Sequence, residues 1–283
     1  MKNILACIDD SLYAPAVCAS AAWVSSRTDA AVALLHAFSP PPQRASLDLS
    51  GAIGLGAKSE LLAKLTELDE THGRTEQRKG KLILTHAEQE LRAAGVQRIE
   101  VLHRRGSLVD VIGELEERAD LIIMGKRGEQ PHVDSQELGS NLERVARALH
   151  KPLLVTAQAF QPIRRFVIAF DGSANATKAL EYISREPLLK DLECHVVMIG
   201  TVSAEIRITL TQIANRLDAA GLKVHTALKI GPRDEVITAY VESKEMDLVV
   251  IGAYRHSRIH DLFTGSTTTS VIRSCEIPVL LFR

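Results

Sequence analysis

The sequence has few aromatic side chains, 4% of its residues, and almost no net charge. Its 34 Lys and Arg residues nearly balance 35 Asp and Glu residues, so the formal net charge is -1. Proteins that bind nucleic acid usually present a basic surface, and those that bind single strands add stacked aromatic rings. The lack of both argues against nucleic acid as a partner.

Cysteines are also few and far apart. The sequence has Cys7, Cys18, Cys194 and Cys275, none of them in a Cys-x-x-Cys pair of the kind that holds zinc or performs dithiol chemistry. They lie mostly within apolar runs, which favours buried free thiols in a reducing compartment.

No apolar run reaches the roughly 20 residues that a membrane-spanning helix needs. The first one, Ile4–Ile8, runs directly into Asp9-Asp10 and indicates a strand, not a signal peptide. We therefore expect a cytoplasmic protein. With 46% hydrophobic residues over 283 positions, it can bury the cores of about two domains.

The most informative stretch runs from Leu121 to Val155. Leu121–Met124 is short, apolar and branched, as in a buried parallel strand, and Gly125-Lys126-Arg127-Gly128 follows it. A polar loop then leads through Gly139-Ser140-Asn141 into Leu142–Leu149, whose apolar spacing predicts an amphipathic helix. Lys151-Pro152 ends that helix before a further strand.

This order of strand, glycine loop and helix start favours the binding of an anion. Glycines let the backbone approach a ligand, and free N–H groups at a helix N-terminus attract phosphate. Ligands of open α/β sheets lie at the carboxyl ends of the strands. The alternative is that Gly125 and Gly128 only turn the chain and Gly139-Ser140 only begins a helix.

The chain contains a repeat, which predicts two copies of one α/β unit. The matching segments are Ile4–Ser11 with Phe166–Ser173, Glu90–Val96 with Arg216–Leu222, Ala119–Gly125 with Met246–Gly252, and Lys151–Val155 with Ile277–Leu281. Alternating strands and helices predict open parallel sheets with helices on both faces. We place the domains at 1–157 and 162–283.

The first copy contains an insertion that begins at Pro40-Pro41-Pro42 and passes several glycines before a charged helix expected near Ser59. This insertion has two open interpretations. It is either a mobile cover over the carboxyl edge of the sheet or a plain surface insertion.

Each copy places an aspartate after its first strand, Asp9 in one and Asp171 in the other. The position lies at the same sheet edge as the glycine loop, so a carboxylate and a phosphate site could hold two parts of one nucleotide. In the first copy Asp10 is a second candidate for this carboxylate. The alternative role of the aspartate in each copy is to cap the helix that follows it.

On these residues the chain resembles the universal stress protein family in its tandem form. The shared features are the aspartate after the first strand, the Asp-Leu strand that ends in glycine, the downstream Gly-Ser and the Pro-initiated last strand. The resemblance covers nearly all of both halves. It implies a Rossmann-like, adenine nucleotide alpha-hydrolase-like fold, with the two units packed as a pseudo-dimer through their last strands.

The family's ATP-binding pattern is Gly, two residues, Gly, nine residues, Gly, then Ser or Thr. Carried over to the first copy, the resemblance implies a site made by Asp9, Ala37, Gly125, Gly128, Gly139, Ser140 and Asn141. Asp9 would lie near the nucleoside, the backbone at Ala37 near the adenine, and the others near the phosphates. Ten residues, Glu129 to Leu138, replace the expected nine, a difference that a surface loop absorbs.

In the second copy the corresponding positions are Asp171, Ile199, Gly252, Arg255, Gly265, Ser266 and Thr267. Arg255 stands where the second glycine belongs. It cannot give a glycine's close approach, although its guanidinium could pair with a phosphate. The first copy is therefore the favoured ATP site.

Other candidates are weaker. His256 and His260 lie four residues apart beside Asp261, but the family pattern places them in a loop, and we predict no metal site. Lys126 and Arg127 could screen phosphate charge or could simply be solvated. No catalytic triad or nucleophile elbow is present, and no general base can be named.

The resulting expectation is a tandem universal stress protein that binds ATP, with or without Mg²⁺, in at least one domain. Hydrolysis would be slow at most, and the nucleotide would act as a ligand that stabilises one conformation, with an unknown protein partner and an optional homodimer of tandem chains. The alternatives are a nucleotide-free scaffold for stress responses and a nucleotide-dependent enzyme, which the missing pyrophosphate loop at Asp9-Asp10-Ser11 disfavours.

Overall fold

The computed structural model describes residues 1–38, 55–129, 138–252 and 267–283, with the side chains of its longest helix described only from Gly73 onward. The described strands form a single sheet in the order β3-β2-β1-β4-β5-β10-β9-β6-β7-β8. The strands are β1 (Asn3–Cys7), β2 (Ala31–Phe38), β3 (Ile99–Arg105), β4 (Leu121–Gly125), β5 (Leu153–Thr156), β6 (Arg165–Ala169), β7 (Glu193–Ile199), β8 (Lys223–Lys229), β9 (Leu248–Gly252) and β10 (Val279–Phe282).

Within each half every strand pair is parallel, and the two halves meet through one antiparallel pair, β5 with β10. Val155 lies opposite Val279 and Leu153 opposite Leu281. Every residue of both strands is buried. The predicted fold class is confirmed, including the meeting of the last strands within one chain.

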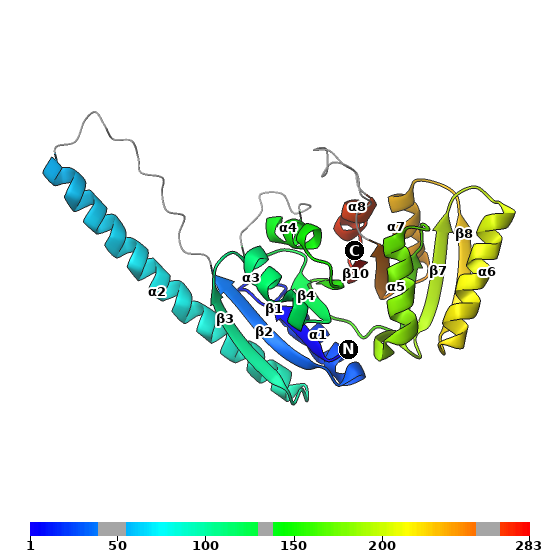
Figure 1. Cartoon of the computed structure of the whole chain (residues 1–283), viewed down its shortest axis with the longest axis horizontal. Helices are drawn as coiled ribbons and strands as arrows, with labels where there is room; N and C mark the ends of the chain where they lie inside the picture. Colours follow the sequence, from blue (N-terminus) through cyan, green and yellow to red (C-terminus); the bar gives the residue numbers. More distant parts are fainter. Residues whose placement is uncertain (39–54, 130–137, 253–266) are drawn as a thin grey trace.

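Helices cover both faces of the sheet (Figure 1). Strand residues alternate between the faces, so Ile4 and Ala6 belong to one core while Leu5 and Cys7 belong to the other. The helices of the first core are α1 (Ala14–Thr28), α2 (Leu55–Ala93), α5 (Ala174–Arg185) and α6 (Ala204–Ala219), and those of the second are α3 (Leu108–Leu115), α4 (Ser140–Ala148), α7 (Arg233–Ser243) and α8 (Thr267–Ser274). Two short 3-10 helices, η1 (Glu116–Arg118) and η2 (Pro187–Leu189), complete the described elements.

The sequence repeat has a structural cause at the aspartate before each central strand. Asp120 Oδ2 accepts hydrogen bonds from the backbone N–H groups of Lys2 and Asn3, at 2.5 and 3.0 Å. In the second half Asp247 Oδ2 accepts from Arg164 and Arg165, at 2.8 and 2.9 Å. Each aspartate thus ties the start of its central strand to the start of the first strand, which explains why it recurs.

Helix α2 begins at Leu55, four residues before the predicted start near Ser59. Its 39 residues correspond to a rod about 58 Å long, and Figure 1 shows it extending well past the sheet of the first half. Residues 39–54, which contain the start of the insertion, lie outside the described residues, so both interpretations of it stay open.

The two halves also contact each other away from the strand pair. The Arg27 side chain of α1 donates hydrogen bonds to the carbonyls of Leu188 and Lys190, and the amino terminus pairs with Glu186 at 2.6 Å. Among the described helices, none combines the length and apolar character needed to cross a membrane.

Candidate functional site

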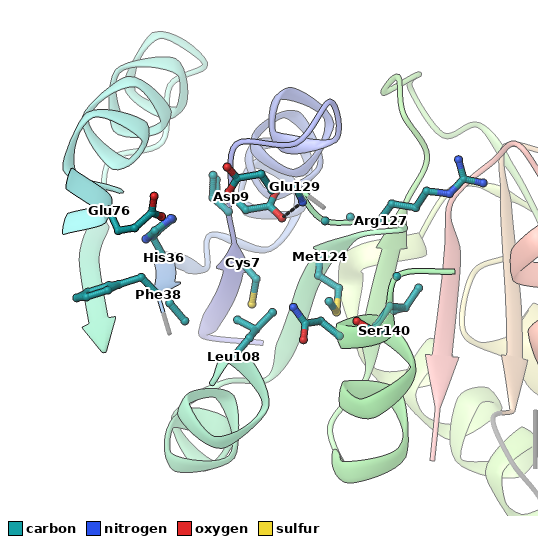
Figure 2. Close-up of a pocket in the computed structure, with 17 residues that line it drawn as sticks. Cys7, Asp9, His36, Phe38, Glu76, Leu108, Met124, Arg127, Glu129 and Ser140 are labelled. Carbon is teal, nitrogen blue, oxygen red and sulfur yellow. Dashed lines mark hydrogen bonds between the residues drawn. The ribbon is translucent and has the colours of Figure 1, made fainter. Parts of the chain in front are cut away.

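A cavity of about 340 Å³ opens at the carboxyl ends of β1, β2 and β4 in the first half. A volume of this size lies within the range of small-molecule sites. In Figure 2 its walls come from the turn after β1, the end of β2, the segment after β4 and the start of α4. It occupies the sheet edge that the sequence predicts for a ligand.

The structure brings together all the residues predicted for the first site. The cavity is lined by Asp9, Ala37, Gly125, Gly128, Gly139, Ser140 and Asn141. These residues come from three separate parts of the chain, and only the fold places them around one space.

Asp9 connects the turn after β1 to the glycine segment. Its Oδ1 accepts from the Ser11 N–H at 3.2 Å, and its Oδ2 accepts from the Glu129 N–H at 3.1 Å, the bond drawn in Figure 2. Asp10 instead faces Lys79 at 3.0 Å and does not line the cavity. The alternative capping role is wrong, because Tyr13 is the N-cap of α1 and no side chain caps that helix.

Helix α4 begins at the wall of the cavity. Gly139 is the N-cap residue, and no side chain among the described residues accepts a cap hydrogen bond there. Ser140 and Asn141, the first two helical residues, are exposed. Among the described residues no side chain competes for the first N–H groups of the helix, and the helix dipole favours an anion beside them.

Three glycines here have little space for a side chain. A Cβ at Gly128 would lie 3.0 Å from Asp9 Oδ2, and one at Gly139 would lie 3.3 Å from the Arg127 Cα. A Cβ at Gly125 would lie only 2.6 Å from the Tyr13 Cβ. Gly125 thus serves the packing of α1 on β4, whereas Gly128 and Gly139 let the two loop segments and Asp9 converge beside the cavity.

Lys126 is not simply a solvated loop residue. Its ammonium group donates to the carbonyls of Arg273, at 2.8 Å, and Cys275, at 3.1 Å, at the end of α8 in the other half. Burial lowers the pKa of Lys126. Arg127 lines the cavity with part of its side chain, and in Figure 2 that side chain extends away from Cys7 and Asp9.

Among the lining residues that the sequence reasoning missed are His36, Phe38 and Glu76. His36 and Phe38 flank Ala37 at the end of β2, so the strand end itself was a signal for them. Glu76 lies on α2, and nothing in the sequence links that helix to the strand ends.

His36 forms part of a histidine pair with His103 on the neighbouring strand, with ring centroids 5.2 Å apart. His36 Nδ1 and His103 Nε2 are buried and have no hydrogen-bond partner among the described residues. Burial lowers the pKa of both imidazoles, and for His36 the charge of His103 lowers the pKa further. Both rings are therefore neutral at pH 7.

The four cysteines are buried and free, as predicted. Cys7 lies on the cavity wall, and burial raises its pKa to about 12. It is therefore a thiol at neutral pH and a poor nucleophile.

In the second half the predicted residues Asp171, Ile199, Gly252 and Thr267 lie at the ends of β6, β7 and β9 and at the start of α8. A Cβ at Gly252 would lie 2.7 Å from the Ala176 backbone nitrogen, which repeats the close packing at Gly125. Asp171 accepts from the Ser173 N–H at 3.0 Å, and Ser173, not Asp171, caps α5. Arg255, Gly265, Ser266 and the predicted loop of His256, His260 and Asp261 lie outside the described residues.

The fold and the cavity define a class of protein: a duplicated open α/β sheet with an anion-attracting helix start and a carboxylate at its strand ends. The chain belongs to the universal stress protein family, whose sequence model matches residues 1–157 and 162–283. It is 39% identical over 287 aligned positions to the universal stress protein Slr1230 of Synechocystis sp., covering 100% of both chains.

Solved structures share the whole architecture. A universal stress protein from Archaeoglobus fulgidus DSM 4304 matches with a TM-score of 0.69 and 21% identity, over 99% of this chain and 96% of that one. A universal stress protein from Pseudomonas aeruginosa UCBPP-PA14 matches with a TM-score of 0.62 and 18% identity, over 100% and 93%. At these identities the likeness concerns the fold alone.

Proposed function

We propose that this chain binds an adenine nucleotide in the cavity of its first half. The glycine pattern around the cavity favours ATP. The observation that carries the proposal is that all seven residues predicted for the first site line this one cavity. A set of residues that only turned the chain or only began helices would have no reason to surround one space.

Each residue has a role that its position supports. The N–H groups at the start of α4 and the side chains of Ser140 and Asn141 would bind the phosphates. Asp9 would accept hydrogen bonds from the ribose hydroxyls, and the backbone at Ala37 would contact the adenine.

The negative charge of the cavity wall predicts that ATP binding depends on Mg²⁺. The carboxylates of Asp9, Glu76 and Glu129 line it, and Lys79 pairs with Glu129 at its rim. Carboxylates repel bare polyphosphate, and Mg²⁺ on the phosphates reduces that repulsion. We therefore expect ATP to bind more tightly with Mg²⁺ than without it.

We assign the nucleotide a regulatory role in the stress response, as a ligand that favours one conformation recognised by a partner protein. The Gly125–Gly128 segment lines the cavity, and its Lys126 binds the end of α8 in the other half. A ligand that orders this segment also acts on the contact between the halves.

The test is ATP affinity, measured by calorimetry with and without Mg²⁺, in the wild type and in a Ser140→Ala/Asn141→Ala chain. Both side chains are exposed, so the fold should be unaffected. Loss of two hydrogen bonds to a charged phosphate, worth about 1.5–3 kcal/mol each, should weaken ATP binding by about a hundredfold or more. Replacing Gly125 or Gly252 by alanine is unsuitable as a test of binding, because the added Cβ atom would clash with a neighbouring segment and disturb the fold.

The matched control is Thr267→Ala, at the start of the corresponding helix of the second half. It should leave ATP affinity unchanged if the first half is the working site. Absence of ATP binding, or equal affinity in all three chains, would replace the proposal with the nucleotide-free scaffold.

A further inference from the structure

A second group of polar side chains lies in the other half, away from the cavity. Glu193 and His195 belong to β7 and His225 to the edge strand β8, in which His225 is the register partner of His195. His195 lies four residues before Ile199, where β7 ends, or about 13 Å along the strand. This group is therefore separate from the predicted nucleotide position of its own half.

The three side chains converge on one point. Glu193 Oε1 lies 3.0 Å from His195 Nε2 and 3.5 Å from His225 Nε2. One ligand atom from each residue lies within 4.8 Å of the other two. Four tetrahedral ligands about 2.1 Å from a zinc ion are about 3.4 Å from one another, so small side-chain adjustments would place all three around one cation.

His195 is oriented for this role by a fourth residue. Its side chain is 8% exposed, and its Nδ1 lies 2.7 Å from the hydroxyl of Tyr240 on α7. Without a metal ion, Nε2 is hydrogen-bonded to Glu193 Oε1. In the tautomer with Nδ1–H donated to Tyr240, the Nε2 lone pair is directed at the centre of the group. A hydrogen bond at the second ring nitrogen is the usual way in which proteins orient a metal-binding histidine.

The site is also accessible. The side chains of His225 and Glu193 are 47% and 34% exposed, respectively, so an ion can enter from solvent and keep a water ligand. Two imidazoles and one carboxylate suit zinc and its first-row neighbours, and they lack the oxygen-only donors that calcium and magnesium prefer. The geometry points to a binding site for a first-row divalent cation, Zn²⁺ by its ligands, at Glu193, His195 and His225.

The experiment uses the full chain, freed of any affinity tag and stripped with EDTA, titrated with Zn²⁺ by calorimetry and with Co²⁺ by absorption. We expect one Zn²⁺ per chain and the visible absorption of low-symmetry Co²⁺. His225→Ala and Glu193→Gln change exposed side chains and should each weaken Zn²⁺ binding by more than about tenfold. Tyr240→Phe should weaken it by about tenfold while the three ligands remain.

His86→Ala is the matched control. His86 and Glu90 form an exposed pair at 3.3 Å on α2, and no third ligand among the described residues completes it. This variant should bind Zn²⁺ as the wild type does. The inference is overturned if the stripped chain takes up no Zn²⁺, if His225→Ala and Glu193→Gln bind as the wild type does, or if binding is lost only in a His256→Ala/His260→Ala chain. Melting in EDTA checks that each variant is folded.

Discussion

At the scale of single residues, the least expected feature is a glycine in the middle of a helix. Gly80 of α2 faces the histidine pair of β2 and β3, and a Cβ there would lie 2.6 Å from both His36 Nδ1 and His103 Nε2. Glycine normally weakens a helix interior by roughly 0.5–1 kcal/mol relative to alanine. Here the missing side chain is what allows α2 to pack against the two rings.

This packing predicts opposite effects of one substitution at two positions of α2. Gly80→Ala should lower the free energy of unfolding by about 1–2 kcal/mol, because the strain of overpacking exceeds the gain in helix propensity. Gly73→Ala should raise it by about 0.5–1 kcal/mol, because no atom lies within 4 Å of its Cβ position. Urea denaturation measures both, and a stabilised Gly80→Ala chain would contradict the packing.

At the scale of elements, Lys126 links the glycine segment of one half to a helix of the other. Its two hydrogen bonds reach carbonyls at the end of α8, where a positive charge also complements the helix dipole. Burial lowers the pKa of Lys126, so part of this stabilisation is offset by the loss of hydration. The net contribution of Lys126 to the free energy of unfolding should therefore be smaller than that of two hydrogen bonds formed without this loss of hydration.

We therefore expect Lys126→Met to lower the free energy of unfolding by about 1–2 kcal/mol, since the alkyl part still packs while the charged hydrogen bonds are lost. Lys151→Met is the matched control, because the Lys151 ammonium group pairs with the exposed Glu117 at 4.0 Å. An exposed pair of this kind contributes about 0–1 kcal/mol. Equal losses in both variants would show that the contact with α8 does not stabilise the chain.

The elements also show how far the sequence alone could lead. Apolar runs, the internal repeat and the cap glycines Gly95 and Gly221 predict the strands and helix ends, and both glycines have the positive φ that such caps need. The glycine segment and the aspartate after the first strand indicate the sheet edge where the first cavity lies, and the family resemblance supplies the predicted residues around it. These features are local, so short patterns contain them.

What the sequence did not predict depends on contacts between distant segments. The packing of α2 against the histidine pair, and with it the place of Glu76 in the cavity wall, depends on the path of a long helix. The partner of Lys126 is 147 residues away. The histidines of the cation site are 30 positions apart and become neighbours only through the pairing of β7 with β8.

At the scale of the whole molecule, the two halves are held together mainly through one continuous sheet. β5 and β10 pair in the middle of it, with every one of their residues buried. An unpaired strand of this kind exposes both apolar side chains and open backbone hydrogen-bonding groups, so it is a template for association. We therefore expect each half on its own to associate through this edge.

This arrangement predicts how the proposed domains 1–157 and 162–283 behave when they are produced separately. Each should self-associate or aggregate through its free β5 or β10 edge, and mixing should give a complex of one copy of each, measured by size exclusion with light scattering. Arg27→Ala in the first half removes hydrogen bonds to Leu188 and Lys190 but not the strand pair, so it should weaken the complex without abolishing it. Two stable monomers that stay apart on mixing would mean that the chain connection, and not the shared sheet, keeps the halves together.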